Sequence, residues 1–321
     1  MNSRNLKLDF IKLLAMCGVM CLHTQMWYID SPIAHFLYIT AVVSVPLFFM
    51  TSGYLLLDKE NVDYKYSGKK ILGILRFVII MTVMFYFLSG IRHGSSFIDA
   101  TLGSLIQKGQ LGVYWYFGAM IIVYALLPVL NVLFCSRFKV FMSIVISLFV
   151  ISSAVFVLNF TNGIHIEQNT IQTFRLWNWL FYFCLGGLLK RFTFHVSVYA
   201  VLFLLIINYL FQINTFHYID SEFCEYYYPS IPVMLLSVSV FQCIRHATIN
   251  LNFVNGGGKL FLPCYTIHMY VIGKTGNVFK EMFSFAGIFC PVFFWILVCA
   301  LSIMLSWIIM KVPYAEKVFR I

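Results

Sequence analysis

The sequence predicts an all-α integral membrane protein, a bundle of about ten transmembrane helices with both termini in the cytoplasm. Three observations predict it: the composition, the spacing of the apolar runs and the distribution of basic residues. The chain of 321 residues is 61% hydrophobic and 11% charged, whereas a soluble domain is about 45–50% apolar and about 25% charged. The apolar surplus has to face lipid, and residues 1–321 are expected to form a single transmembrane domain.

Ten apolar runs are each close to the length of about 20 residues that a helix needs to cross a bilayer. The first run is expected to be retained, because Asp9 and Lys12 lie near its start and no small-residue cleavage site follows it. The ninth is the least regular, since it holds Lys259, Pro263 and His268. The runs lie at about 7–26, 35–57, 70–91, 113–134, 139–159, 176–190, 196–213, 229–245, 259–277 and 287–310.

The basic residues indicate which connections face the cytoplasm. With the N-terminus inside, the inner segments hold sixteen of the 22 lysines and arginines, and the outer segments hold five. Cytoplasmic loops carry such an excess, so an even number of spans is predicted. The net charge of +10 is spread between apolar runs and forms no single patch, so nucleic-acid binding is not expected. The nine cysteines show no metal-ligand spacing, and no metal site is expected.

Ionisable side chains in the first run predict a polar stripe on one helix. Asp9 and Lys12 are one turn apart, and His23 follows Lys12 at about 1100° of helix, about 20° from the same face. Charged groups at membrane depth are costly and usually mark function. An imidazole is suited to take a proton from a hydroxyl. From helix position alone, a His23 that is hydrogen-bonded and inert at the outer interface is an equal alternative.

Further polar groups lie in the second, third and fourth runs. Ser52 and Gly53 permit close helix packing, and Tyr54 adds a hydroxyl. Basic residues at the start of the third run can hold the phosphates of a ligand or of lipid, or can serve only as a topology signal; they are Lys69 and Lys70. Arg76 lies deeper in that run and needs a partner. The segment 115–117 (WYF) is either an aromatic anchor or a surface on which a sugar or an adenine stacks.

Together these segments resemble the acyltransferase 3 family of membrane-bound acyltransferases. The opening Arg4–Lys12 (RNLKLDFIK), followed by His23, resembles the family's R-x-x-x-L-D-x-x-R with its histidine, and Val45–Tyr54 (VPLFFMTSGY) resembles V-P-x-F-F-x-x-S-G-Y. The resemblance covers nearly the whole chain. Weaker similarities are Tyr114–Phe117 with Tyr124 and Pro128, then Tyr182–Gly186, and finally Lys311–Pro313.

The chain also departs from the family pattern. Lys12 stands where arginine is usual, which keeps the charge but loses the bidentate fork. Lys70 and Arg76 are further apart than the family's basic pair. His268 falls where tyrosine is usual and Val271 where histidine is usual, so the resemblance carries no role over to His268.

The resemblance implies transfer of an acyl group, most often acetyl from cytoplasmic acetyl-CoA, to a hydroxyl of a surface polysaccharide or a lipid-linked sugar, by a multi-pass protein of the bacterial plasma membrane. His23 would be the general base or a transient acyl carrier, and Asp9 and Lys12 would position the inner half of the site. No cofactor would be bound permanently. The CoA contacts would come from Arg4, Lys69, Lys70 and Arg76, and the acceptor contacts from Ser52, Tyr54, Trp115, Tyr116 and Tyr124.

Two other classes of function are compatible with ten helices and buried charges. A transporter or flippase for a sugar or lipid would need no histidine chemistry, although the chain shows no inverted repeat and no paired broken helices. A structural subunit of a glycan assembly machine would tolerate the loss of both His23 and Arg76. The sequence leaves a homo-oligomer possible, because lipid-facing and packing faces are equally apolar.

Overall fold

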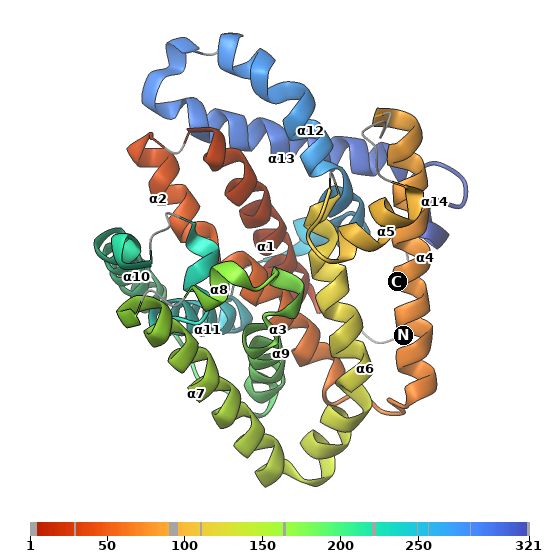
Figure 1. Cartoon of the computed structure of the whole chain (residues 1–321), viewed down its shortest axis with the longest axis vertical. Helices are drawn as coiled ribbons and strands as arrows, with labels where there is room; N and C mark the ends of the chain where they lie inside the picture. Colours follow the sequence, from red (N-terminus) through yellow and green to blue (C-terminus); the bar gives the residue numbers. More distant parts are fainter. Residues whose placement is uncertain are drawn as a thin grey trace. The chain divides into compact units, whose positions relative to one another are not determined.

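The computed structural model is built of α-helices, and no strand occurs in the residues that it describes (Figure 1). It divides into two compact units. Unit 1 comprises the residues up to Thr51 together with Phe192–Glu316, and unit 2 comprises Ser52–Arg191 with the residues from Lys317 onward. The structure describes residues 5–28, 30–89, 96–109, 111–162, 165–219, 223–248, 250–255, 257–282 and 284–319.

Unit 1 holds the first helices and the last helices of the chain. The side chain of Asn5 caps the first of them by accepting from the backbone N–H groups of Lys7 and Leu8, which relieves two of the unpaired donors at a helix start. The helices are α1 Leu6–Gln25, α2 Pro32–Thr40, the first part of α3 Ser44–Leu56, α10 Val198–Ile219, α11 Ile231–His246, α12 Phe261–Met282 and α13 Cys290–Ile309.

The core of unit 1 forms where α1 packs against α12 and α13. Two polar side chains fasten this packing: Gln25 donates to the carbonyl of Pro291 at 3.2 Å, and the Trp295 indole donates to the carbonyl of Cys17 at 2.9 Å. Polar groups that pair in this way can be buried at low cost. The apolar core consists of Met16, Met20, Cys264, Val271, Ile272, Phe279, Cys290, Phe294 and Val298.

Unit 2 holds the middle of the chain, and two of its helices were not predicted. The helix α5 Phe97–Leu105 lies in the expected outer loop 92–112 and begins with a capping box between Ser96 and Asp99. The short α8 Ile166–Asn169 lies in the next connection that was predicted to be outer. The remaining helices are α4 Tyr64–Ser89, α6 Trp115–Ser136, α7 Phe138–Asn162 and α9 Leu176–Arg191.

Within unit 2, the end of α3 lies directly against α9. A Cβ atom built on Gly53 would be 1.7 Å from the carbonyl oxygen of Phe183, so only glycine fits at this crossing. The close helix packing predicted from Ser52 and Gly53 is thereby confirmed. Asn131 of α6 adds a second tie, since its amide donates to the carbonyl of Leu57 at 3.2 Å.

All ten predicted runs contain helices, including the doubtful ninth, which is the 22-residue α12. Six helical segments in the described part of the chain are long and apolar enough to cross a membrane. Of the other four, α9 and α11 have only 16 residues each, and α1 and α12 carry charged side chains. About ten spans and cytoplasmic termini therefore stay predictions. The six are Pro32–Leu56, Tyr64–Phe87, Gly112–Ser136, Phe138–Thr161, Val198–Ile219 and Gly287–Ile309.

The crossing at Gly53 can be tested with Gly53→Ala. The added methyl group has to separate two backbones, and we expect a loss of about 1–3 kcal/mol in unfolding free energy. Tryptophan fluorescence of the detergent-solubilised chain would report a lower midpoint of thermal unfolding. Gly68→Ala is the matched control, because its Cβ meets nothing within 4 Å and alanine is the better helix former by about 1 kcal/mol. Equal midpoints for Gly53→Ala and wild type would contradict the close approach.

Candidate functional site

The predicted polar stripe lies on one uninterrupted helix, α1 of unit 1. Asp9 is buried, with 7% of its surface exposed, and Lys12 and His23 are half-buried. Because the helix does not break, Lys12 and His23 are separated along its axis by about 16 Å. Asp9 and Lys12 are therefore near the start of α1 and His23 near its end. Arg4, predicted to contact the donor, lies outside the described residues.

The structure brings a second histidine to His23. The ring of His268, on α12, has its centroid 5.3 Å from that of His23, with the two planes at 38°. This separation is within the range of about 4.5–7 Å that is typical of directly packed rings. His268 is completely buried. Two imidazoles from helices far apart in the sequence thus meet inside unit 1.

The hydrogen bonds of His268 determine which ring nitrogen carries its proton. Nδ1 lies 2.7 Å from the carbonyl oxygen of Tyr265. A carbonyl can only accept, so Nδ1 is the protonated nitrogen and, in the neutral ring, Nε2 holds a lone pair. That Nε2 atom is buried without a hydrogen-bond partner among the described residues. Most buried polar atoms are paired, so this nitrogen is available to another group.

Two of the predicted acceptor-binding residues are joined in unit 2. The hydroxyl of Tyr116 on α6 is hydrogen-bonded to the Ser52 side chain. The ring of Tyr54 lies 5.8 Å from the ammonium group of Lys190, and Lys190 forms an ion pair with Asp58 at 3.2 Å. Motifs more than sixty residues apart therefore meet at this end of α3.

The predicted donor-binding residues lie along α4. Lys69 is exposed and Lys70 is half-buried, with its ammonium 5.9 Å from the Tyr66 ring. Arg76, expected deep within its span, is instead exposed, because it lies on an outward face of α4. Its guanidinium donates to the carbonyl of Lys317 at 3.3 Å, which supplies the partner that the sequence required.

Trp115 packs against Trp179, with the ring centroids 5.1 Å apart. Both indoles are buried, Trp115 with 9% of its surface exposed and Trp179 with none. In this structure Trp115 thus packs against the ring of Trp179, tilted by 34°. Tyr124, further along α6, is half-buried. Contacts of Trp115 or Tyr124 with a substrate stay predictions.

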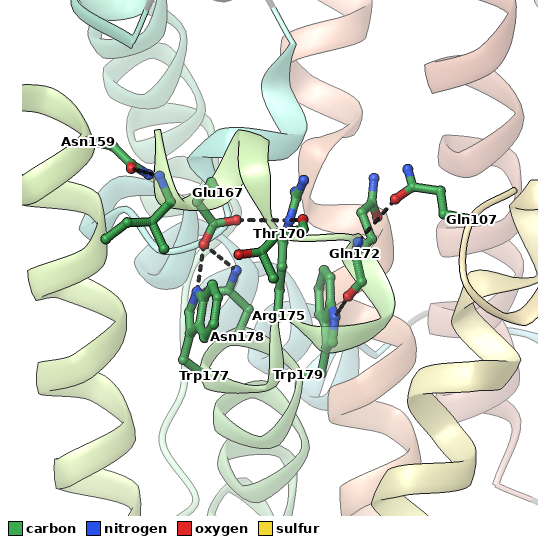
Figure 2. A network of polar contacts seen from close by, with 10 residues as sticks. Gln107, Asn159, Glu167, Thr170, Gln172, Arg175, Trp177, Asn178 and Trp179 are labelled. Carbon is green, nitrogen blue, oxygen red and sulfur yellow. Dashed lines mark hydrogen bonds and ion pairs between the residues drawn. The ribbon is translucent and has the colours of Figure 1, made fainter. Parts of the chain in front are cut away.

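A buried polar network fixes the connection that leads to Trp179 (Figure 2). The Arg175 guanidinium and the Glu167 carboxylate form an ion pair at 3.3 Å, with 3% and 0% of their side chains exposed. The indole of Trp177 and the amide of Asn178 donate to the same carboxylate. Trp179 donates to the backbone carbonyl of Gln172. The segment between α7 and α9 is therefore held rigidly, although the sequence indicated only an outer loop.

A hollow of about 510 Å³ opens in unit 2 beside the start of α4 and the second half of α6. It contains none of the residues predicted to bind the donor or the acceptor. Among the described residues, no three histidine, cysteine or acidic side chains lie close enough to hold a metal ion. The hollow is lined by Val62, Asp63, Tyr64, Pro128, Val129, Val132, Leu133 and Arg137.

A family model described as an acyltransferase domain matches residues 5–311 of the chain. The chain belongs to the acyltransferase 3 family. The match includes both units, which confirms the resemblance seen in the motifs. With its apolar helices, the protein is a multi-pass membrane acyltransferase. Neither the curated proteins nor the solved structures contain a match to it.

Two features of this acyltransferase were missed by sequence reasoning. His268 was visible as an ionisable group in an apolar run, which is a functional signal in itself, but its position departs from the family pattern. Glu167 and Arg175 gave no signal, because a loop sequence does not reveal that its charges pair and become buried. Both features depend on contacts between distant segments.

The buried ion pair of the acyltransferase predicts an unequal response to two similar substitutions. Glu167→Gln leaves the buried Arg175 guanidinium without its counter-charge, and we expect a cost of about 3–5 kcal/mol. Asp58→Asn breaks the Lys190 pair, whose side chains are 33% and 48% exposed, and exposed pairs contribute about 1 kcal/mol or less. Thermal unfolding of the two purified variants measures the difference. Equal losses would show that burial gives the Glu167–Arg175 pair no special weight.

Proposed function

We propose that the protein is an O-acyltransferase of the bacterial plasma membrane that moves an acetyl group from cytoplasmic acetyl-CoA to a hydroxyl of a surface polysaccharide or a lipid-linked glycan. The observation that carries the proposal is the half-buried imidazole of His23 in a chain of this family. An imidazole nitrogen can take up and release a proton during catalysis. The half-burial of His23 also shields it partly from competing water.

The reaction exchanges a thioester for an ester. His23 removes the proton from the acceptor hydroxyl, and the oxygen attacks the acetyl carbonyl. The C–S bond breaks as the C–O bond forms, and the proton passes from the imidazolium to the leaving thiolate, giving free CoA. General base catalysis of this kind contributes about 10²–10⁴-fold to a rate.

The donor is assigned to cationic residues, because CoA carries several phosphates. Arginine and lysine bind phosphate through charge-assisted hydrogen bonds. Lys69 and Lys70 lie on the first turns of α4, and Arg76 follows two turns later. Arg4 belongs to the same proposed set. Asp9 and Lys12, at the start of α1, position the inner part of the site.

The acceptor is assigned to hydroxyl and aromatic side chains. Sugars bind through hydrogen bonds to their hydroxyls and through packing on aromatic rings. The hydrogen-bonded pair of Ser52 and Tyr116 offers both kinds of contact, and Tyr54, Trp115 and Tyr124 complete the proposed set. The protein's partners are thus the bilayer, an acyl-CoA and a glycan.

The proposal is tested by mass analysis of surface glycan from cells with the gene, without it, and with His23→Asn in its place. We expect the glycan to lose one acyl group per modified unit when the gene is absent, and equally in the His23 variant. His35→Asn is the matched control, since His35 is a half-buried histidine of α2 in the same unit and has no proposed role. Immunoblots of membranes verify equal insertion.

Two results would contradict the proposal in different ways. A glycan whose mass does not depend on the gene would exclude acylation of that glycan and favour a transporter or a structural subunit. Full acylation in the His23→Asn strain would leave the activity in place but remove His23 from it.

A further inference from the structure

We infer that His268 is a positioning residue for acyl transfer, whose buried Nε2 accepts a hydrogen bond from His23 while His23 takes the proton from the acceptor hydroxyl. The inference rests on the proposed function, since it assigns a task within that reaction. It is carried by the juxtaposition of the two rings and by the unpartnered nitrogen, both inside unit 1.

The geometry of His268 leaves one nitrogen for this task. The bond from Nδ1 to the carbonyl of Tyr265, 2.7 Å long, fixes both the ring and its tautomer. The ring of Tyr265 packs beside it, with centroids 5.7 Å apart, and restricts rotation further. A ring held in this way presents Nε2 as an acceptor, with no hydrogen-bond partner among the described residues.

The unpaired lone pair of Nε2 explains why His23 would donate a hydrogen bond to it. A lone pair buried without a partner is destabilised relative to one that accepts a hydrogen bond. When His23 is protonated, its N–H groups become strong donors, and a charge-assisted hydrogen bond forms readily in a site of low dielectric constant. The centroid distance of 5.3 Å places a neutral imidazole beside the one that becomes charged.

His268 also takes the place of the group that usually orients a catalytic imidazole. In hydrolases with a serine nucleophile, a carboxylate holds the base and stabilises its charged form. The acidic residue of the stripe, Asp9, precedes His23 by fourteen residues on the same straight helix, or about 21 Å. That carboxylate is too far along α1 to bond to His23, whereas the ring of His268 is adjacent.

Each proton and bond in the sequence is accounted for. The hydroxyl O–H bond breaks as its proton moves to one nitrogen of His23, while the N–H on the other nitrogen of His23 donates to Nε2 of His268. The acetyl C–O bond forms and the C–S bond breaks in the same step. His23 then gives its proton to the thiolate of CoA. Both imidazoles end neutral, and no further reactant is consumed.

The inference is tested with His268→Asn in the full-length protein in lipid nanodiscs. Labelled acetyl-CoA is the donor, and envelope glycan extracted from cells lacking the gene is the acceptor. The asparagine amide can still donate towards the Tyr265 carbonyl, but it has no basic nitrogen. We expect kcat to fall by about ten- to a hundredfold and the KM for acetyl-CoA to stay unchanged. Loss of the base itself would lower kcat more, by about 10²–10⁴-fold.

The solvent isotope effect separates proton transfer from mere packing. In mixtures of light and heavy water, the wild-type kcat should follow a curved dependence on deuterium content, because the transferred proton and the His23 N–H proton bonded to Nε2 both contribute. The kcat of His268→Asn should follow a linear dependence. His35→Asn is the control and should keep the wild-type kcat and curvature. A wild-type kcat and curve in His268→Asn would overturn the inference, as would a rise in KM with the curvature retained.

Two further results complete the test. Nitrogen NMR of histidine-labelled wild-type protein, which needs no variant to fold, should show His268 protonated at Nδ1 and bare at Nε2; the opposite tautomer would overturn the inference. If the wild-type protein transfers no label, the proposed function fails and the role of His268 fails with it. If the wild-type protein transfers label and His268→Asn transfers it equally well, the proposed function stands and only the role of His268 is refuted.

Discussion

Water cannot satisfy polar groups in the hydrocarbon core of a bilayer, so each such group has to find its partner within the protein. The helices meet this constraint locally where they can. Thr51 donates to the carbonyl of Leu47 at 2.7 Å, and Thr82 donates to that of Val78 at 2.9 Å. Longer side chains reach other segments, as Gln25 does to Pro291. Nε2 of His268 is one of several buried polar atoms in the described residues that have no hydrogen-bond partner, and it belongs to a ring that packs against His23.

The helices themselves could be predicted, because the length and apolarity of a run are local properties. Even the irregular ninth run forms α12, since Pro263 lies in the first turn, where its missing N–H is no loss. The helices α5 and α8 were not foreseen. The capping box stabilises α5, and a hydrogen bond from the Ile166 N–H to the Asn159 side chain fixes the start of α8. Neither interaction appears as hydrophobic periodicity.

The candidate site was predictable in its parts but not in its connections. Single motifs pointed to His23, Ser52 and Tyr116, because polar groups in apolar runs are conspicuous. That Ser52 bonds to Tyr116, and that His268 lies against His23, depends on which faces of distant helices meet. For Arg76 the sequence indicated the need for a partner but not its identity. The partner is a backbone carbonyl, which every residue has, so residue identity cannot predict it.

The network around Glu167 also bears on how the topology of this protein can be mapped. Reporter enzymes and epitope tags are commonly inserted into connections between helices, on the assumption that loops accept them. The connection at 165–175 holds a buried ion pair and hydrogen bonds to two tryptophan indoles, so a tag there would disrupt the fold that it is meant to report. The exposed residues 193–194, in the connection between α9 and α10, are the better place for an insertion.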